Sequence, residues 1–231
     1  RQRQMCIRDS LYAVVFNRTT ETDLTEDQLP QVDIYKYKQV IFVGDSRTEF
    51  MENVLTGMGE SATKNVKFVC SAGKGLDWFT TTGWAQLYSI VQHDSNSILS
   101  KKTAVIFNFG VNDLSKSADY AEYYNWIAPQ LKSKGCELYF MSVNPVNRLM
   151  LPNAGRADRS EAAVRSFNQY MKANLSSAYT YIDMYSYLKS TGYSFASDHY
   201  GTGTVDDGLH YTTRTYKRIF AKCMDSLRVP A

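Results

Sequence analysis

The 231-residue sequence has few of the residues that hold metals or build disulfide frameworks, with 4 cysteines and 3 histidines. No two cysteines form a C-x-x-C pair, which argues against a zinc site or a redox dithiol. Cys70 and Cys136 fall in or beside apolar runs, where we expect buried free thiols. We therefore expect neither a zinc site nor a redox dithiol, and the reaction that we predict below requires no metal and no organic cofactor.

Long apolar runs and blocks of like charge are also missing. No segment approaches the roughly 18 apolar residues of a membrane-spanning helix, and no run of Lys and Arg exceeds two residues. Because the formal net charge is only +3, we expect no nucleic-acid partner. We expect a soluble protein without a membrane span. Its oligomeric state is left open, and both a secreted or cell-surface location and the cytoplasm are compatible with the sequence.

What the chain does contain is an alternation of short apolar runs with longer helical patterns. The expected strands are 39–44, 66–70, 103–109, 136–143 and 178–184. The expected helices are 47–58, 77–93, 117–134, 158–175 and 212–227. Strands that alternate with helices form parallel βαβ units. We predict a single α/β domain over 39–231, with a three-layer, doubly wound (flavodoxin-like) α/β/α fold around a parallel sheet of about five strands.

Residues 1–38 are predicted to form an N-terminal lead-in to this domain. Residues 17–38 are polar, and the first ten residues, RQRQMCIRDS, show no periodicity. We expect these ten residues to be disordered or foreign to the natural protein, so they carry no weight in the fold prediction.

Polar and glycine-rich residues follow four of the expected strands. In doubly wound sheets ligands bind at the carboxyl ends of the strands, so these tips should converge on one edge. They are Gly-Asp-Ser-Arg (44–47), Ser-Ala-Gly-Lys-Gly (71–75), Gly-Val-Asn-Asp (110–113) and Asn-Pro-Val-Asn (144–147). Each tip is also ordinary turn chemistry, so none identifies a site by itself.

A serine nucleophile at the first tip, Ser46, would need a base from among the three histidines. His93 ends a helical pattern, where an imidazolium suits the helix dipole, and His199 lies in a polar loop. His210 precedes the last expected helix and has Asp207 three residues upstream. That spacing lets the carboxylate bond Nδ1 and leaves Nε2 free to take a proton from a serine.

Two further tips offer donors for an oxyanion. Asn112 places a side-chain amide at the expected edge of the sheet. Gly73 and Gly75 have backbone N–H groups that no side chain hinders. These signals are weak when taken one at a time, but all of them fall on the same predicted edge.

The joint pattern resembles the SGNH hydrolases, also called the GDSL esterase/lipase superfamily. Gly-Asp-Ser ends the first strand, a glycine-bearing loop ends the second, Gly-x-Asn-Asp ends the third, and Asp-x-x-His precedes the last helix. The four blocks follow the family's order from about residue 39 to residue 227. The nucleophile does not lie in a G-x-S-x-G elbow, which distinguishes the chain from the α/β-hydrolases.

The resemblance implies catalytic roles for three residues. Ser46 would be the nucleophile and would also offer its own N–H to the oxyanion. His210 would act as general base and then general acid, oriented by Asp207. Asp45 and Asp113 would brace loops rather than take part in the chemistry.

The rest of the oxyanion hole would come from the Asn112 amide and a glycine N–H of the second block. The family often has Asn-x-x-x-x-Gly in that block, whereas this chain has Cys70 where the asparagine would stand. Counting from the strand favours Gly75 as the donor, with Gly73 as the alternate.

We predict a serine esterase that hydrolyses short-chain or carbohydrate O-acyl or O-acetyl esters, so the expected partner is a small-molecule or carbohydrate ester. The alternatives are an acyltransferase that uses the same acyl-enzyme and a non-catalytic anion- or glycan-binding module. For Arg47, a surface ion pair competes with a contact to substrate. The aromatic residues of 192–206 can either stack on a sugar or pack their own loop down. The residues that we expect to line the substrate are Arg47, Asn144, His199 and Tyr200.

Overall fold

Five short apolar strands form a parallel sheet with the order β2-β1-β3-β4-β5. This computed structural model describes residues 24–25, 28–32, 36–94, 102–151, 159–196, 202 and 206–227. The first ten residues, His199 and Tyr200 lie outside these ranges. The strands are β1 (Tyr37–Gly44), β2 (Val66–Cys70), β3 (Lys102–Asn108), β4 (Cys136–Met141) and β5 (Tyr179–Ile182).

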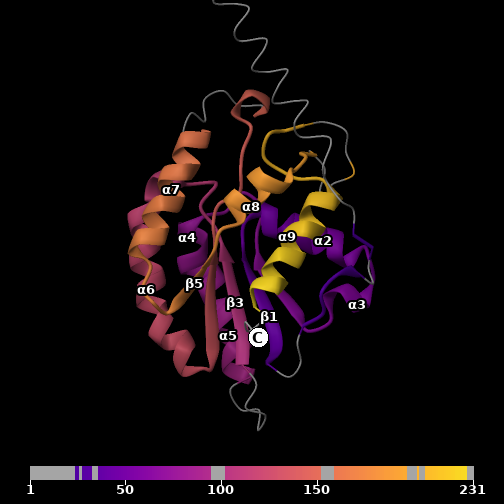
Figure 1. The fold of residues 1–231 in the computed structure, drawn as a ribbon. Coiled ribbons are helices and arrows are strands. Elements are labelled where there is room, and N and C mark those ends of the chain that lie inside the picture. The colour runs from indigo at the N-terminus through magenta and orange to yellow at the C-terminus, as the bar shows by residue number, and fades with distance from the viewer. Residues whose placement is uncertain are drawn as a thin grey trace, which may run out of the picture.

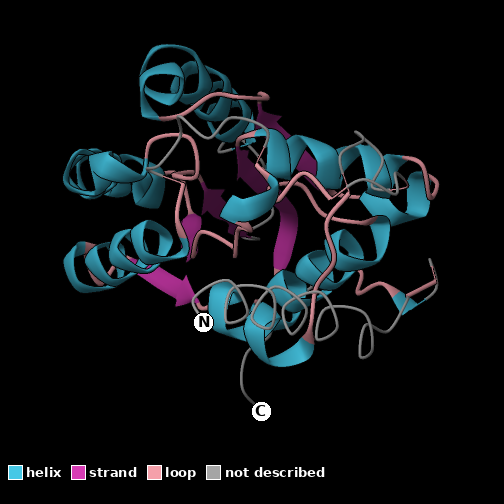
Figure 2. Ribbon diagram, turned by 90° about the horizontal axis from the view of Figure 1, so that it is seen from above, coloured by secondary structure: helices cyan, strands magenta, loops and turns pink. Residues whose placement is uncertain are grey.

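The central strands are buried on both faces because their side chains alternate between two apolar cores. In β1, Ile41 and Val43 belong to one core, and Val40 and Phe42 belong to the other. Helices cover both faces, as Figures 1 and 2 show. The three-layer α/β/α fold predicted from the sequence is therefore confirmed.

The helices divide between the two faces according to the core that their buried residues join. The first core is covered by α5 (Trp84–Asp94), α6 (Ser117–Ser133) and α7 (Glu161–Asn174). The second is covered by α2 (Ser46–Thr56), α8 (Met184–Thr191) and α9 (Thr213–Ser226). Two of the latter, α2 and α9, pack against each other (Figure 1).

Shorter elements connect these helices, and the structure differs from the prediction at the expected helix 77–93, at the expected strand 178–184 and in α8, which was not predicted. The expected helix 77–93 is α4 (Leu76–Trp78), a π-helical segment (Phe79–Gly83) and α5 in succession. The strand expected at 178–184 ends at Ile182, because Asp183 caps α8 by accepting a hydrogen bond from Ser186 N at 3.0 Å. The remaining elements are α3 (Glu60–Thr63) and two 3₁₀ turns, Leu114–Lys116 and Arg148–Met150.

The register of the sheet aligns the ends of three strands. Gly44 at the end of β1 pairs with Cys70 of β2 on one side and with Asn108 of β3 on the other. The tips that follow these strands therefore leave the sheet at one level, with the tip of β1 in the middle. This places Ser46 between the loop that carries Gly75 and the loop that carries Asn112.

Within the part of the chain that the structure describes, no helix combines the length and the apolar character needed to cross a bilayer.

Candidate active site

Ser46 is the first residue of α2 and follows the end of β1 with only Asp45 between them. The preceding Asp45 is the N-cap of the helix, and its Oδ1 accepts a hydrogen bond from Arg47 N at 3.0 Å. A capping carboxylate fixes where the helix begins. It therefore fixes the position of the Ser46 side chain, which is only 5% exposed.

The structure brings Ser46, His210 and Asp207 into one hydrogen-bonded chain. His210 Nε2 lies 2.9 Å from Ser46 Oγ, and His210 Nδ1 lies 2.7 Å from Asp207 Oδ2. A carboxylate can only accept, so Nδ1 carries the proton and Nε2 is the acceptor that faces the serine hydroxyl. This is the arrangement that a serine nucleophile and its base require.

Backbone donors of its own loop hold Asp207 in place. Its Oδ1 accepts from Leu209 N at 2.9 Å and from His210 N at 2.8 Å. Burial acts to raise the pKa of Asp207, but the hydrogen bonds from the His210 side chain and from these backbone N–H groups outweigh it and lower the pKa below its ordinary value. The carboxylate is therefore ionised and able to fix the tautomer of His210.

The imidazole of His210 also stacks on Phe50, a contact that we did not predict. The two ring centroids are 4.3 Å apart with an interplanar angle of 24°. Phe50 lies four residues after Ser46 in α2, and side chains at this spacing share a helix face. The helix that begins at Ser46 thus also supplies one wall of the space around the His210 ring.

Arg47 fits neither of the two expectations from the sequence. It is 3% exposed, so it is not a surface residue. Its guanidinium donates to the backbone carbonyls of Leu209, Asn144 and Pro145 at 2.9 to 3.0 Å and lies over the ring of Tyr211. Every nitrogen of the guanidinium is engaged inside the protein, so Arg47 is not placed to contact a substrate.

The contacts of Arg47 join segments that are distant in sequence. Its bond to Leu209 O reaches the residue next to His210, and its other two bonds reach the loop after β4. The buried cation also opposes a rise in the pKa of Asp45, which burial brings to about 6. Arg47 therefore ties the start of α2 to the loop that carries His210.

On the other side of Ser46, the Asn112 side chain bridges two loops. Its Nδ2 donates to Lys74 O at 2.8 Å, and its Oδ1 accepts from Arg159 Nη2 at 2.6 Å. Lys74 directly precedes Gly75, so the bridge links the two tips from which oxyanion donors were predicted. The sequence had drawn no attention to Arg159, which stands just before the N-cap residue of α7.

Gly75 lies against the carboxylate of Asp113, which explains why this position lacks a side chain. A Cβ at Gly75 would come within 2.3 Å of Asp113 Oδ2. The same carboxylate accepts from Leu76 N at 2.9 Å and from Tyr120 OH at 2.7 Å. Asp113 thus braces the loop of Gly75, as Asp45 braces the start of α2, and burial raises its pKa.

The other residues expected to line a substrate lie elsewhere or outside the described residues. Asn144 is 1% exposed, so it is buried beneath the surface rather than available to a ligand. Tyr193 and Phe195 are buried and pack against Tyr211, which favours the interpretation that they hold their loop down. His199 and Tyr200 fall in a segment that the structure does not describe.

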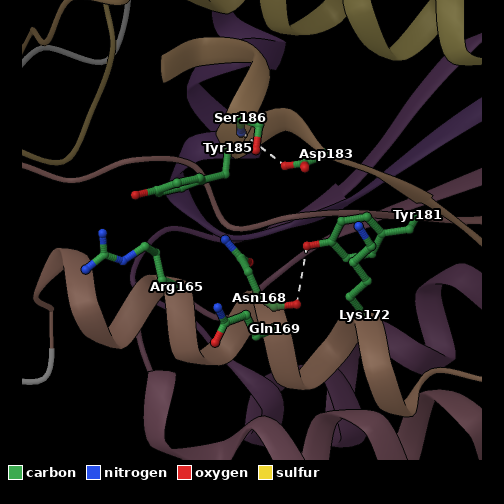
Figure 3. A pocket seen from close by; sticks show the side chains of 8 residues that line it. All are labelled: Arg165, Asn168, Gln169, Lys172, Tyr181, Asp183, Tyr185 and Ser186. Carbon is green, nitrogen blue, oxygen red and sulfur yellow. Dashed lines mark hydrogen bonds between the residues drawn. The ribbon is translucent and has the colours of Figure 1, made fainter. Parts of the chain in front are cut away.

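A hollow of about 250 Å³ between α7 and α8 shares none of the predicted site residues. Arg165 and Lys172 line it together with Tyr181, Asp183 and Tyr185 (Figure 3). Among the described residues, no three His, Cys, Asp or Glu side chains gather as a metal site, either here or beside Ser46.

The sequence profile of the GDSL-like lipase/acylhydrolase family matches residues 40–223, which include both Ser46 and His210. A search of curated protein sequences finds no match.

Solved structures similar to this chain share its fold at low sequence identity. A candidate acylhydrolase from Bacteroides fragilis is 16% identical with a TM-score of 0.53, over 87% of this chain and 92% of that one. A candidate SGNH hydrolase from Slackia heliotrinireducens is 12% identical with a TM-score of 0.57, over 84% and 100% of the two chains. An acetyl xylan esterase is 11% identical with a TM-score of 0.52, over 82% and 100%. With the family profile matched over most of its length, the chain belongs to the GDSL-like lipase/acylhydrolase family.

Proposed function

We propose that this protein is a serine esterase that hydrolyses carboxylic esters with short-chain acyl groups, including O-acyl and O-acetyl groups on carbohydrates. The observation that carries the proposal is the hydrogen-bonded chain from Ser46 Oγ through His210 to Asp207, with distances of 2.9 and 2.7 Å. Its position at the carboxyl ends of the strands is where ligands bind in doubly wound sheets.

In the acylation half of the reaction, Ser46 Oγ attacks the ester carbonyl carbon while His210 Nε2 takes the hydroxyl proton. The carbonyl electron pair moves to oxygen, and the resulting oxyanion accepts hydrogen bonds from Ser46 N, Gly75 N and the Asn112 amide. Collapse of this intermediate breaks the bond to the alcohol oxygen. His210 gives its proton to that oxygen, and the alcohol leaves.

Deacylation repeats the same steps with water. His210 takes a proton from water as the water oxygen attacks the acyl-enzyme, and the oxyanion forms again in the same hole. Collapse breaks the bond to Ser46 Oγ, which takes the proton back from His210, and the acid is released. Among the described residues the N–H groups of Ser46 and Gly75 have no hydrogen-bond partner, so both can serve as donors.

An apolar surface beside the catalytic loop supports an acyl substrate. Leu149 and Met150 are 79% and 45% exposed on the 3₁₀ turn after β4. This turn follows Asn147, whose N–H donates to Gly208 O at 2.8 Å, within the loop between Asp207 and His210. Exposed apolar side chains at this place suit the hydrocarbon part of an ester.

The test is hydrolysis by the wild-type protein and by Ser46→Ala, measured on nitrophenyl esters of rising chain length, acetylated xylan and acyl thioesters. We expect Ser46→Ala to abolish turnover while circular dichroism and melting temperature stay close to wild type. Unchanged turnover in this variant would remove Ser46 from the proposal. The profile across the panel identifies the acyl length and the alcohol.

Labelling with a fluorophosphonate separates an enzyme from a binding module. We expect stoichiometric modification of Ser46 in the wild type and none in Ser46→Ala. A binding module that uses the N–H groups at the start of α2 would not react. Addition of sugar or alcohol acceptors to the ester assay, with transfer products measured by mass spectrometry, distinguishes hydrolysis from acyl transfer.

A further inference from the structure

The Asn112 amide is held from both sides, and the two contacts fix its orientation. Lys74 O is an acceptor and needs an N–H, whereas the guanidinium of Arg159 is a donor and needs an oxygen. Only one assignment of the amide satisfies both, with Nδ2 on Lys74 O at 2.8 Å and Oδ1 on Arg159 Nη2 at 2.6 Å. Among the described residues Asn112 makes no other hydrogen bond, so its second N–H remains available.

We propose that Arg159 is a positioning residue that orients and polarises the Asn112 amide so that its remaining N–H stabilises the oxyanion. This inference rests on the proposed esterase function. A hydrogen bond from a cation is shorter and stronger than one between neutral groups. It draws electron density toward Oδ1, which makes the N–H groups of the same amide better donors, as in other hydrogen-bonded chains.

The surroundings of Arg159 suit this role. The residue is 6% exposed, so solvent and salt screen its charge less than they would on the surface. It precedes Ser160, the N-cap of α7, whose hydroxyl accepts from Ala163 N at 3.1 Å. A cation at the N-terminal end of a helix is on the unfavourable side of the helix dipole. Helix stability therefore does not account for an arginine here, whereas the contact with Asn112 does.

Hydrogen bonds attach α7 to the end of the sheet, so the residue before this helix, Arg159, is held in a fixed place. Asn168 in the middle of α7 bonds both backbone groups of Val143, accepting from its N–H at 2.7 Å and donating to its carbonyl at 2.8 Å. Val143 follows β4 at the same edge of the sheet. The chain of contacts from β4 through α7 and Arg159 thus ends on the oxyanion donor.

The experiment compares Arg159→Met and Arg159→Lys, each in the wild-type and in the Asn112→Ala background. The assays are ester hydrolysis and the second-order rate of Ser46 labelling by a fluorophosphonate. Asn112→Ala should reduce kcat by about 100- to 1000-fold, as loss of one oxyanion donor does. Arg159→Met should reduce kcat by about 10- to 100-fold with little change in KM, because it weakens a donor to the transition state.

A positioning role through Asn112 predicts that the two effects do not add. In the Asn112→Ala background, Arg159→Met should change kcat by less than about 2-fold. Arg159→Lys keeps the positive charge but lacks the planar guanidinium with its fixed donor directions, so it should retain part of the activity. The matched control is Arg165→Met, because Arg165 is an exposed arginine six residues further along, on α7, and lines the separate hollow (Figure 3). We expect it to leave kcat unchanged.

Two outcomes would overturn the inference while leaving the esterase proposal intact. One is an Arg159→Met variant with the kcat of the wild type. The other is a loss that persists undiminished in the Asn112→Ala background, which would mean that Arg159 acts by another route. If Arg159→Met does not fold, the same comparison is made with Arg159→Lys. Failure of the esterase proposal gives a different result, namely a wild-type protein that neither hydrolyses esters nor labels at Ser46.

Discussion

The two sides of the candidate site are held in different ways. On the nucleophile side, Ser46, Arg47 and Phe50 are 3 to 5% exposed and belong to the first turns of one helix. On the oxyanion side, Gly75 and Asn112 are half-buried and Lys74 is exposed, and they come from loops after two different strands. The nucleophile side is therefore a buried part of the protein built on one helix, whereas the oxyanion side consists of two loops joined by a side-chain contact.

This difference indicates which substitutions should affect stability and which should affect only the reaction. Contacts on the nucleophile side are buried, so their loss leaves unpaired polar groups in the interior. On the oxyanion side the contact between Asn112 and Lys74 is exposed, so water can replace a lost partner there, although Arg159 itself is buried. We therefore expect kcat and stability to fall together on the first side and to separate on the second.

The largest effect is expected from Asp207→Asn. An amide N–H facing His210 Nδ1 would favour the tautomer with its proton on Nε2, which cannot accept from Ser46. We expect kcat to fall on the order of 10⁴-fold, as for the equivalent change in other serine hydrolases. Stopped-flow or steady-state ester hydrolysis measures this loss.

The same variant also has a signature in the pH dependence of stability. The folded-state pKa of Asp207 is lowered, so ionisation stabilises the fold above the unfolded-state pKa, and this contribution is lost as pH falls through the folded-state value. Urea unfolding should show a gap between wild type and Asp207→Asn at pH 7 that closes at pH values below about 3.9. A gap independent of pH would contradict the assignment of an ionised Asp207.

The next effect separates the two candidate glycines on the oxyanion side. Gly75→Ala should reduce kcat by about 10- to 100-fold, less than complete loss of a donor, because its Cβ would displace the Asp113 carboxylate 2.3 Å away. Gly73 has a φ of +70° and nothing within 4 Å of an added Cβ. Gly73→Ala should therefore lower the free energy of unfolding by about 1 to 2 kcal/mol and leave kcat unchanged. The reverse pattern would make Gly73 the oxyanion donor.

A smaller loss of activity, with a loss of stability, is expected for Arg47→Met. It removes the donors of the Leu209 and Asn144 carbonyls and leaves the Pro145 carbonyl with Tyr211 OH alone. We expect a fall of about 2 to 3 kcal/mol in the free energy of unfolding. A kcat lower by about 10-fold should accompany it, because the loop of His210 loosens.

Arg148→Met is the control for Arg47→Met, since Arg148 is an exposed arginine on the neighbouring 3₁₀ turn. Both variants are measured by denaturant unfolding and ester hydrolysis. If Arg47→Met is as stable as the wild type, the expectation that substitutions on the nucleophile side lower both stability and kcat is wrong.

The smallest effect on activity is expected at the opposite end of the sheet. Glu137 is the second residue of β4. It accepts from Lys102 at 2.6 Å and from Tyr37 OH, and it forms an ion pair with Lys36. Burial acts to raise the pKa of Glu137, but these contacts together outweigh it and lower the pKa to about 2. Its ionisation therefore stabilises the fold above the ordinary pKa, and this contribution is lost as pH falls towards 2.

Glu137→Gln should accordingly be less stable than wild type at pH 7, with a difference that disappears near pH 2, while kcat at pH 7 is unchanged. The measurements are thermal unfolding across this pH range and ester hydrolysis. A fall in kcat would show that a loss of stability by itself lowers kcat. The fall in kcat expected for Arg47→Met would then have to be corrected for the loss of stability that accompanies it.

The sequence predicted the strands and the Ser46–His210–Asp207 arrangement because both have local signals. Strands covered on both faces appear as short apolar runs, and the Asp-x-x-His spacing lets one loop hold both partners of its hydrogen bond. Phe50 also has such a signal, since four residues along a helix that begins at Ser46 bring a side chain to the same face. The eight residues of α8 were missed because they continue the apolar, aromatic run of β5.

The two buried arginines of the candidate site, Arg47 and Arg159, could not be predicted in the same way. Arginine is rarely buried, so Arg47 was expected either at the surface or on the substrate, and its actual partners are backbone carbonyls that no residue type marks. Arg159 meets Asn112 across 47 residues of chain. Only the packing of α7 beside the tip of β3 creates that contact.

The separation of Ser46 from His210 along the chain also sets when the candidate site can first form during synthesis. Ser46 and His210 are 164 residues apart, and at about 5 to 20 residues per second a ribosome needs roughly 8 to 33 s to travel from one to the other. The last helix, α9, follows His210 and packs against α2. A nascent chain that already presents Ser46 therefore lacks the histidine to which Ser46 is hydrogen-bonded, and the candidate site is complete only after His210 and the helix that follows it have been made.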